Sequence, residues 1–224
     1  MPSSTVEDYL KAILLQEQGL APGELVTMGQ IASALEVAPG TVTAMVKTLE
    51  REDLVDYSPY SGVRLSDDGR RTATRVLRRH RLIELFLVEV LGLDWSAVHD
   101  EAERLEHAMS DAVIDRIDAL LGHPRVDPHG DPIPEAGGEL QPELSVCLRD
   151  CPAGDGFRVA RVSDQDEDFL KFVERHGLKP GTRVAVEARE PLADAVTVRP
   201  HGGVSVTLGG EAAAKLWLAA DADT

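Results

Sequence analysis

The chain has 224 residues, of which 43% are hydrophobic and 28% charged, so it is long enough to bury one large core or two small ones. No run of 18 apolar residues occurs and the acidic N-terminus does not resemble a secretory signal, which excludes a membrane span and predicts a cytoplasmic protein. The net charge of −16 argues against nucleic acid, but residues 84–140 alone, with 3 basic against 14 acidic residues, account for −11 of it.

The N-terminal third predicts a helix-turn-helix. Residues 4–18 have an apolar stripe typical of a helix, with Ser4 or Thr5 as its N-cap. Thr27 is expected to cap a short helix with Ile31, Ala34 and Leu35 facing inward, and a turn at residues 36–37 leads into a second helix over about 39–52. Two short helices around a tight turn are typical of a DNA-reading unit.

A β-hairpin is predicted immediately after these helices. Residues 54–65 alternate between apolar and polar types around the turn sequence SPYSG. A hairpin in this position is the wing of a winged-helix domain. Ser66 is then expected to cap a long helix over about 67–91, which carries the basic run RRTATRVLRRHR.

The remaining chain changes from helical to β-rich patterning. A further helix is predicted over roughly 95–121, followed by a Pro- and Gly-rich stretch that reads as an ordered turn passing into a linker. From about residue 144, four short β-like runs and one helix near 166–176 suggest a small barrel. Cys147 and Cys151 are the only cysteines, and two ordinary thiols are favoured over a disulfide or half of a metal site.

The segment VHDEAERLEHAMSD carries a candidate metal site. On a helix, Glu103, Glu106 and His107 are spaced i, i+3 and i+4, so they share one face. His99 lies one turn earlier on the same stripe, and the preceding helix contributes a second pair spaced i and i+4, His80 and Glu84. A solvated Glu/His face is the alternative, but several such donors with few local cations favour a divalent metal ion.

The segments HRLIE and VHDEAERLEHAMSD, placed behind a winged helix, resemble the diphtheria-toxin-repressor family of metal-dependent regulators. The resemblance covers residues 4–135 closely and 144–220 more loosely. It implies a mainly α protein with a small β part. The expected domains are a winged helix-turn-helix DNA-binding domain (1–74), a helical metal-binding and dimerisation domain (75–138) and an SH3-like β-barrel (144–224).

The resemblance also implies two metal sites. The primary site would be completed from the first helix, where the matching residue is Asp8, to give the set Asp8, Glu103, Glu106 and His107. The second site would use His80, Glu84 and His99 with a ligand from the SH3-like domain, for which Asp164 is the best match and Glu167 a weaker one. Two roles are open for Asp127 and His129. They could contribute a metal ligand, as in some relatives, or they could stabilise their own loop.

Donor chemistry indicates which metal is expected. The positions of Asp8 and Glu103 resemble Met and Cys sites in the iron-responsive branch, whereas this chain has oxygen donors at both. Three carboxylates and one imidazole suit Mn²⁺ better than a set containing sulfur, so the manganese regulators are the closer match. Lys11 stands near where some of those relatives carry a further acid, which argues against a close two-metal cluster in the primary site. Fe²⁺ remains the alternative cofactor.

The expected partner is double-stranded operator DNA, bound by a homodimer when metal is present, with repression of metal-uptake genes. No membrane and no small-molecule substrate is expected. The candidate DNA contacts lie at the start of the second helix of the motif, on its exposed side and in the wing: Ala38, Pro39, Gly40, Thr41, Thr43, Lys47, Tyr60 and Arg64. Thr41 and Thr43 equally suit a helix start.

Three other functions compete with this one. The first is an iron sensor of the same architecture. The second is a metallohydrolase that activates water with the Glu/His cluster, although no H-E-x-x-H motif is present. The third is a winged-helix regulator indifferent to metal, whose acidic segment is only a solvated face. The sequence favours a non-enzymatic, metal-dependent regulator.

Overall fold

A computed structural model describes residues 3–136 and 144–221 of the chain. The described residues form two compact units, one built from residues up to 79 with 134–136, the other from 80–133 with 144–221. No helix in these two ranges is both long enough and apolar enough to cross a membrane.

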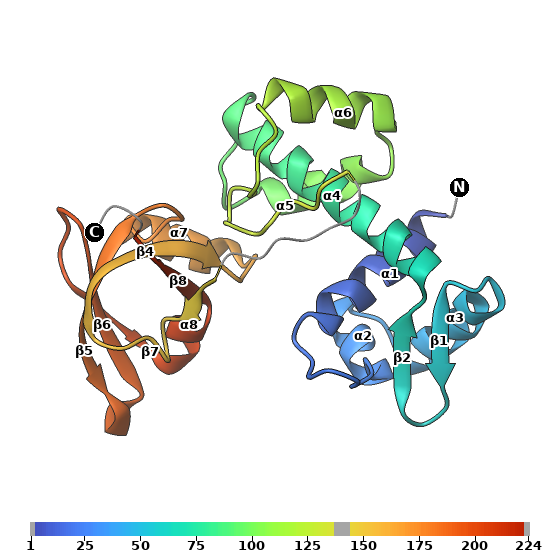
Figure 1. The fold of residues 1–224 in the computed structure, drawn as a ribbon, viewed down its shortest axis with the longest axis horizontal. Helices are drawn as coiled ribbons and strands as arrows, with labels where there is room; N and C mark the ends of the chain where they lie inside the picture. The colour runs from blue at the N-terminus through green and yellow to red at the C-terminus, as the bar shows by residue number, and fades with distance from the viewer. Residues whose placement is uncertain (1–2, 137–143, 222–224) are drawn as a thin grey trace. The chain divides into compact units, whose positions relative to one another are not determined.

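The first unit is a winged helix-turn-helix, drawn in blue to cyan in Figure 1. Its elements are α1 (Ser4–Glu17), α2 (Met28–Ala34), α3 (Pro39–Arg51), β1 (Val55–Ser58), β2 (Gly62–Leu65) and the first part of α4 (Asp67–Glu89). Glu36 turns the chain between α2 and α3 with a positive φ of 53°. The two strands pair antiparallel from Val55 opposite Leu65 to Ser58 opposite Gly62, which confirms the predicted wing.

Local capping explains most helix starts in this unit. Thr27 and Gln30 form a reciprocal capping box at α2, and the Ser66 hydroxyl accepts the Gly69 N–H at the start of α4. Two details differ from the sequence prediction. Ser3 caps α1 in place of Ser4 or Thr5, since its hydroxyl accepts the Val6 N–H. Ala34 is exposed and Ala32 is buried, because the inward face of α2 is set by packing against the neighbouring helices.

A close approach between Gly69 and Leu54 joins the wing to α4. A Cβ atom on Gly69 would lie 1.9 Å from the Leu54 carbonyl oxygen, which is backbone and cannot rotate away. We expect Gly69→Ala to lower the free energy of unfolding by about 1–3 kcal/mol through overpacking. Gly29→Ala is the matched control, because only the Thr27 hydroxyl lies within 4 Å and helix propensity should raise stability by about 0.5–1 kcal/mol. Urea unfolding followed by circular dichroism checks both; equal midpoints would contradict the steric argument.

The helical part of the second unit comprises the rest of α4, then α5 (Val98–Glu106) and α6 (Asp111–Leu120). The single helix predicted over 95–121 is therefore wrong. The chain leaves helical geometry after His107, and Ser110 takes an extended conformation with ψ near 154° before Asp111 begins α6. Ser followed by Asp is a helix-start signal inside a stretch whose apolar periodicity continues across the break.

The C-terminal part of the second unit is an antiparallel barrel-like sheet with strand order β3-β8-β4-β5-β6-β7 (Figure 1). The strands are β3 (Val146–Cys147), β4 (Gly154–Val162), β5 (Arg183–Glu190), β6 (Ala195–Pro200), β7 (Val206–Gly209) and β8 (Leu216–Ala220). Helix α7 (Glu167–Arg175) was predicted, whereas α8 (Gly210–Ala214), β3 and β8 were not. Both cysteines are free thiols, and burial raises the pKa of Cys151.

The loop over residues 127–133 is ordered and held against β4. Asp127 Oδ1 accepts the backbone N–H groups of His129 and Asp131, and the His129 carbonyl accepts the Val162 N–H at 2.8 Å. Gly130 has a φ of +85°, and a Cβ there would lie 2.0 Å from the Ala160 carbonyl oxygen. Residues 137–143 of the predicted linker lie outside the described residues.

Candidate metal centre

Glu106 is the most deeply buried member of the predicted triad. It ends α5 with no exposed surface, and its Oε2 accepts a hydrogen bond from His80 Nδ1 of α4 at 2.6 Å. Its other oxygen lies 3.3 Å from Nε2 of His107, the C-cap residue of the same helix. A carboxylate between two imidazoles combines hard oxygen and borderline nitrogen donors, which is a set that Mn²⁺, Fe²⁺ and Zn²⁺ all accept.

His80, Glu84 and His99 meet as the sequence predicts. Glu84 Oε1 lies 3.0 Å from His80 Nε2 and 3.2 Å from His99 Nδ1, and the two ring nitrogens are 3.2 Å apart. Adjacent donors around a six-coordinate ion with bonds of about 2.1 Å are separated by about 3 Å. These three atoms are therefore already spaced as ligands of one cation. Glu103 Oε1 lies beside them, 3.7 Å from His80 Nδ1 and 3.8 Å from His99 Nε2.

The pKa of Glu84 is lowered despite its burial. Burial by itself would raise its pKa, but the neighbouring His80, His99 and His129 rings outweigh this effect and lower the pKa below the usual range. The carboxylate is only 1% exposed. A buried charged carboxylate surrounded by imidazoles is a ready ligand for a divalent ion.

Asp127 and His129 form a third donor group with Glu84, and all three are buried. His129 Nε2 donates to the Trp95 carbonyl at 2.9 Å, and a carbonyl only accepts, so the proton is on Nε2. His129 Nδ1 is buried without a hydrogen-bond partner and lies 3.9 Å from Glu84 Oε2. With a neutral ring, a cation between His129 Nδ1 and Glu84 Oε2 would satisfy both atoms, so the residues present fit a metal ion.

Charge at Asp127 is costly without such a cation. Burial, together with the nearby carboxylates of Asp131 and Glu84, raises the pKa of Asp127 well above its usual range, although Arg81 acts in the opposite direction. The sequence prediction left Asp127 and His129 open between a ligand and a loop-stabilising role. The structure gives Asp127 the loop contacts, and it also places both residues beside Glu84.

Three further predicted ligands belong to other elements of the chain. Asp8 is a half-buried residue of α1 in the first unit. Asp164 lies just after β4, where Oδ2 pairs with Lys215 Nζ at 2.5 Å and Oδ1 accepts the Asp166 N–H. Glu167 begins α7 and pairs with Lys171. Among the described residues, neither Asp164 nor Glu167 belongs to a group of three metal-type donors.

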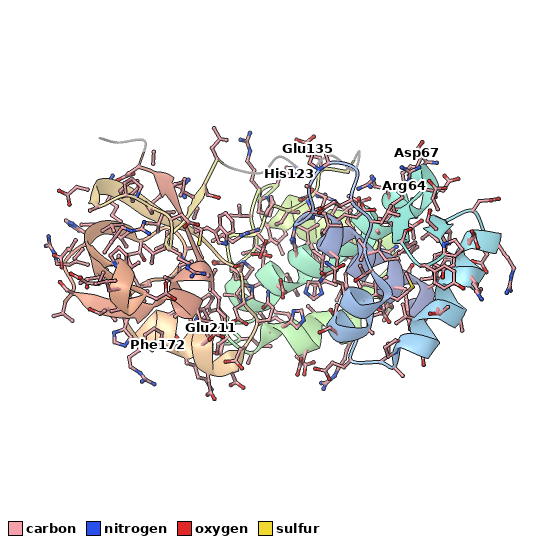
Figure 2. All side chains as sticks on the ribbon, turned by 90° about the horizontal axis from the view of Figure 1, so that it is seen from below. Arg64, Asp67, His123, Glu135, Phe172 and Glu211 are labelled. Carbon is pink, nitrogen blue, oxygen red and sulfur yellow. The ribbon has the colours of Figure 1, made fainter. Side chains whose placement is uncertain are left out.

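The candidate DNA contacts lie on the surface of the first unit. Ala38, Pro39, Gly40 and Thr41 are exposed at the N-terminus of α3, where Ala38 makes no side-chain cap. Three others are exposed further along: Lys47 on α3, and Tyr60 and Arg64 in the wing, where Arg64 (labelled in Figure 2) pairs with Asp56 at 2.9 Å. Thr43 is half-buried and donates back to the Pro39 carbonyl, as a helix residue does.

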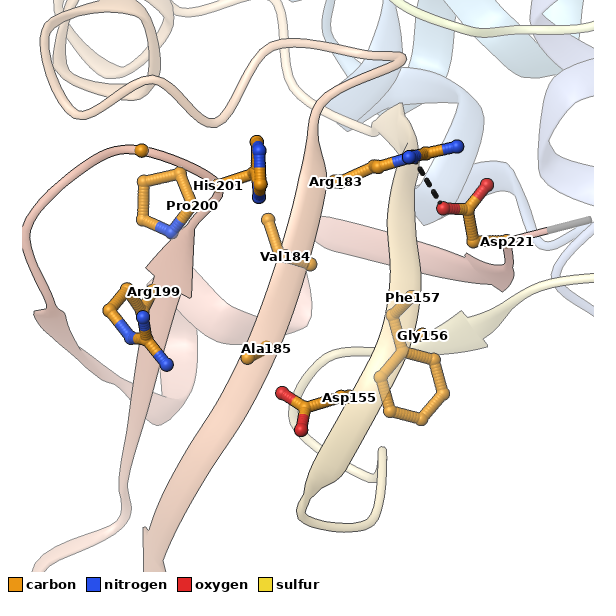
Figure 3. A pocket seen from close by; sticks show the side chains of 11 residues that line it. Asp155, Gly156, Phe157, Arg183, Val184, Ala185, Arg199, Pro200, His201 and Asp221 are labelled. Carbon is orange, nitrogen blue, oxygen red and sulfur yellow. Dashed lines mark ion pairs between the residues drawn. The ribbon is translucent and has the colours of Figure 1, made fainter. Parts of the chain in front are cut away.

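A pocket of about 270 Å³ lies in the barrel and is separate from the donor groups. Strands β4, β5 and β6 and the residues after them line it, among them Phe157, Arg199 and His201 (Figure 3). Arg183 pairs with Asp221 at 2.6 Å across one side of the pocket. Among the described residues, none that lines this pocket belongs to the groups of three metal-type donors.

Family models match nearly the whole chain. Residues 1–63 match the N-terminal DNA-binding domain of iron-dependent repressors, and residues 66–135 match their metal-binding and dimerisation domain. Residues 146–220 match the FeoA domain.

Individual relatives match over the same extent. The diphtheria toxin repressor of Corynebacterium efficiens is 33% identical over 91% of this chain and 90% of its own length. The iron-dependent repressor IdeR of Mycobacterium tuberculosis is 34% identical over 92% of this chain and 89% of its own length. Among solved structures, a manganese-dependent transcriptional repressor in complex with manganese is 40% identical, with a TM-score of 0.88 over 96% of this chain and 99% of that one. The structure of ScaR with bound Zn²⁺ is 34% identical, with a TM-score of 0.78 over 98% of this chain and 100% of that one.

Proposed function

The chain belongs to the diphtheria-toxin-repressor family of metal-dependent transcriptional repressors, and we propose that it is a manganese-responsive member. The family consists of DNA-binding regulators and not of enzymes, so the metallohydrolase alternative is discarded. The observation that carries the proposal is the cluster of buried Glu and His donors around Glu84 and Glu106, in a chain that also has a winged helix.

Manganese is proposed on donor chemistry. Asp8 and Glu103 supply oxygen donors at positions that resemble Met and Cys sites in the iron-responsive branch. Hard oxygen donors suit Mn²⁺ better than sulfur donors do. Solved relatives include repressors described as manganese-dependent or manganese-activated, whereas IdeR relatives are described as iron-dependent. Ligand type does not by itself reject Fe²⁺, so the choice of metal needs a direct test.

The proposed primary site uses Asp8, Glu103, Glu106 and His107, and the proposed second site uses His80, Glu84 and His99. For the second site, Asp164 is the proposed ligand from the C-terminal domain. To bind the metal, Asp164 would have to give up its ion pair with Lys215. Because Glu84 also lies beside Asp127 and His129, we add these two buried residues to the ligands of the second site.

The bound metal supplies positive charge and a fixed link between its ligands. Asp8 belongs to the helix that precedes the DNA-reading helices, whereas Glu103, Glu106 and His107 belong to the metal-binding and dimerisation domain. Shared ligation would restrict α1, and with it the spacing of two recognition helices in a homodimer. Dimers read half-sites at a fixed spacing, so lost hinge freedom raises affinity for the operator. Neutralising part of the acidic segment also favours approach to phosphate.

The proposed partner is double-stranded operator DNA near metal-uptake genes, in the cytoplasm. Exposed Thr41 and Lys47 on α3 are proposed to contact phosphate, and Arg64 and Tyr60 to extend the contact through the wing. The exposed N-terminus of α3, at Ala38, Pro39 and Gly40, is proposed to meet thymine methyl groups in the major groove.

Operator binding titrated with Mn²⁺, Fe²⁺ and Zn²⁺ under anaerobic conditions tests this function. The duplexes are selected from a random pool with the full chain and Mn²⁺, then measured by fluorescence anisotropy at fixed salt. We expect Mn²⁺ to raise affinity by at least about 30-fold, equivalent to about 2 kcal/mol of coupling. Activation by Fe²⁺ at lower concentrations than Mn²⁺ would identify an iron sensor. Equal affinity with and without metal would indicate a metal-indifferent regulator.

A further inference from the structure

We propose that the pocket in the barrel binds a small zwitterion with the chemistry of a free amino acid, whose carboxylate is held at β6 and whose ammonium group is held at β4. Among the described residues, the pocket and the groups of metal-type donors share no member, so this binding goes beyond metal sensing. The volume of about 270 Å³ lies below the range of about 300–1,000 Å³ that suits drug-sized ligands, so the pocket fits a compact molecule.

Ala185 lies in the middle of the pocket, between a cationic and an anionic side. It belongs to β5, the strand between β4 and β6, and its register partner on β6 is Arg199. On the other side, β4 passes Ala185 in an irregular stretch over residues 154–157 that includes Asp155. Figure 3 shows the Arg199 guanidinium and the Asp155 carboxylate on either side of Ala185. The small side chain between two larger charged ones leaves a hollow for a ligand.

Arg199 is fixed in place as an anion-binding group. Its Nε donates to Glu187 Oε1 at 2.5 Å, and the Ser205 hydroxyl donates to the other oxygen of Glu187 at 2.6 Å. The hydrogen bonds from Ser205 and Arg199 lower the pKa of Glu187, so the carboxylate that orients the guanidinium stays charged. Both Nη groups of Arg199 are without a partner among the described residues. Two parallel N–H donors on one guanidinium match the two oxygens of a carboxylate.

His201 lies on the same side of the pocket as Arg199. Its backbone N–H donates to the Arg183 carbonyl at 2.8 Å, which continues the pairing with β5 beyond the end of β6. Residues two positions apart in extended chain share a face, so the His201 ring lies beside the Arg199 guanidinium along the pocket. In the described ranges, this ring makes no hydrogen bond, and its N–H is a further donor for a carboxylate.

Asp155 gives the opposite side of the pocket a negative charge. Its side chain is exposed and makes no hydrogen bond or ion pair with any other described residue. The second acid of the pocket, Asp221, is already paired with Arg183 at 2.6 Å. An unpaired carboxylate repels a simple anion and attracts an ammonium group. A ligand that carries both charges therefore satisfies both sides, whereas a simple anion satisfies only one.

Calorimetric titration of the full chain with each of the standard amino acids tests this site. The chain is kept metal-free, so that the amino acids do not act as chelators, and acetate and methylammonium serve as comparators that each carry one of the two charges. We expect at least one amino acid to bind with a Kd of about 1 mM or below. Both comparators should bind at least about 10-fold more weakly. No binding of any amino acid at about 10 mM would overturn the proposal. Acetate binding as tight as that of the best amino acid would overturn it as well.

Charge variants assign the ligand to the pocket. Arg199→Gln and Asp155→Asn should each weaken binding of the best amino acid by about 10–100-fold, because each removes one charge-assisted contact. Asp155→Asn should not weaken acetate binding, since it removes only a repulsive charge. Arg149→Gln is the matched control and should keep the wild-type affinity. The Arg149 side chain is 52% exposed, as is that of Arg199, and it pairs with Asp194 outside the pocket.

Ala185→Val tests the hollow without a change in charge. A β-branched side chain suits the strand, so the fold should be kept, while the added methyl groups occupy the space between Arg199 and Asp155. We expect at least about 10-fold weaker binding of the amino acid. Wild-type affinity in Ala185→Val, or in both charge variants, would place the ligand elsewhere and overturn the assignment. Circular dichroism of each variant establishes that the fold is unchanged.

Discussion

Glu106→Gln should abolish metal-activated operator binding, with a loss of at least about 100-fold in metal affinity at the primary site. The substitution keeps the size of the side chain but removes the negative charge from a residue with no exposed surface. Its two oxygens lie 2.6 Å from His80 Nδ1 and 3.3 Å from His107 Nε2, so the neutral amide weakens donors in both proposed sites. Calorimetric Mn²⁺ titration and fluorescence anisotropy with operator DNA measure the two effects.

Glu101→Gln on the same helix is the control for Glu106→Gln. Glu101 is about half-exposed and pairs with Arg104 at 2.7 Å, so its loss removes one surface ion pair, which contributes little to stability. We expect wild-type metal and operator affinities for this variant. If Glu106→Gln bound operator with wild-type affinity at the same Mn²⁺ concentration, the assignment of Glu106 as a ligand would be wrong.

The pair of substitutions Asp8→Met and Glu103→Cys should shift the metal preference from Mn²⁺ toward Fe²⁺ and softer ions. Both changes replace an oxygen donor with sulfur, which Mn²⁺ binds weakly. We expect the Mn²⁺ concentration needed for half-maximal operator binding to rise by about 10–100-fold, while that for Fe²⁺ stays the same or falls. Anaerobic titrations of the wild type and the double variant with both metals give the ratio directly.

Glu101→Cys controls for the mere presence of a thiol on α5. It places sulfur on an exposed position of the same helix, away from the donor groups, and should leave the ratio of the two metals unchanged. A double variant with the wild-type ratio would show that donor type at Asp8 and Glu103 does not set selectivity. Geometry at the other ligands would then be the remaining cause.

The winged helix could be predicted because its signals are local. Thr27 and Gln30 form their capping box three residues apart, Glu36 and Val37 lie at the turn, and the wing pairs residues less than a dozen positions apart. The prediction failed where one local signal masked another. Apolar periodicity continues through residues 107–110, so the sequence predicts the interior of a helix where Ser110 is the N-cap of α6. Strand β8 was missed because its partners β3 and β4 are distant in the sequence.

The candidate metal centre divides in the same way. Helical spacing alone determined that Glu103, Glu106 and His107 share a face and that His80 and Glu84 form a pair, because a repeat of 3.6 residues per turn is a local property. Only the tertiary structure decided that His80 bridges Glu106 and Glu84, and that His129 Nδ1 faces Glu84. The position of His129 depends on a loop closed by Asp127 and Gly130 against β4, and no periodicity of the sequence encodes such a closure.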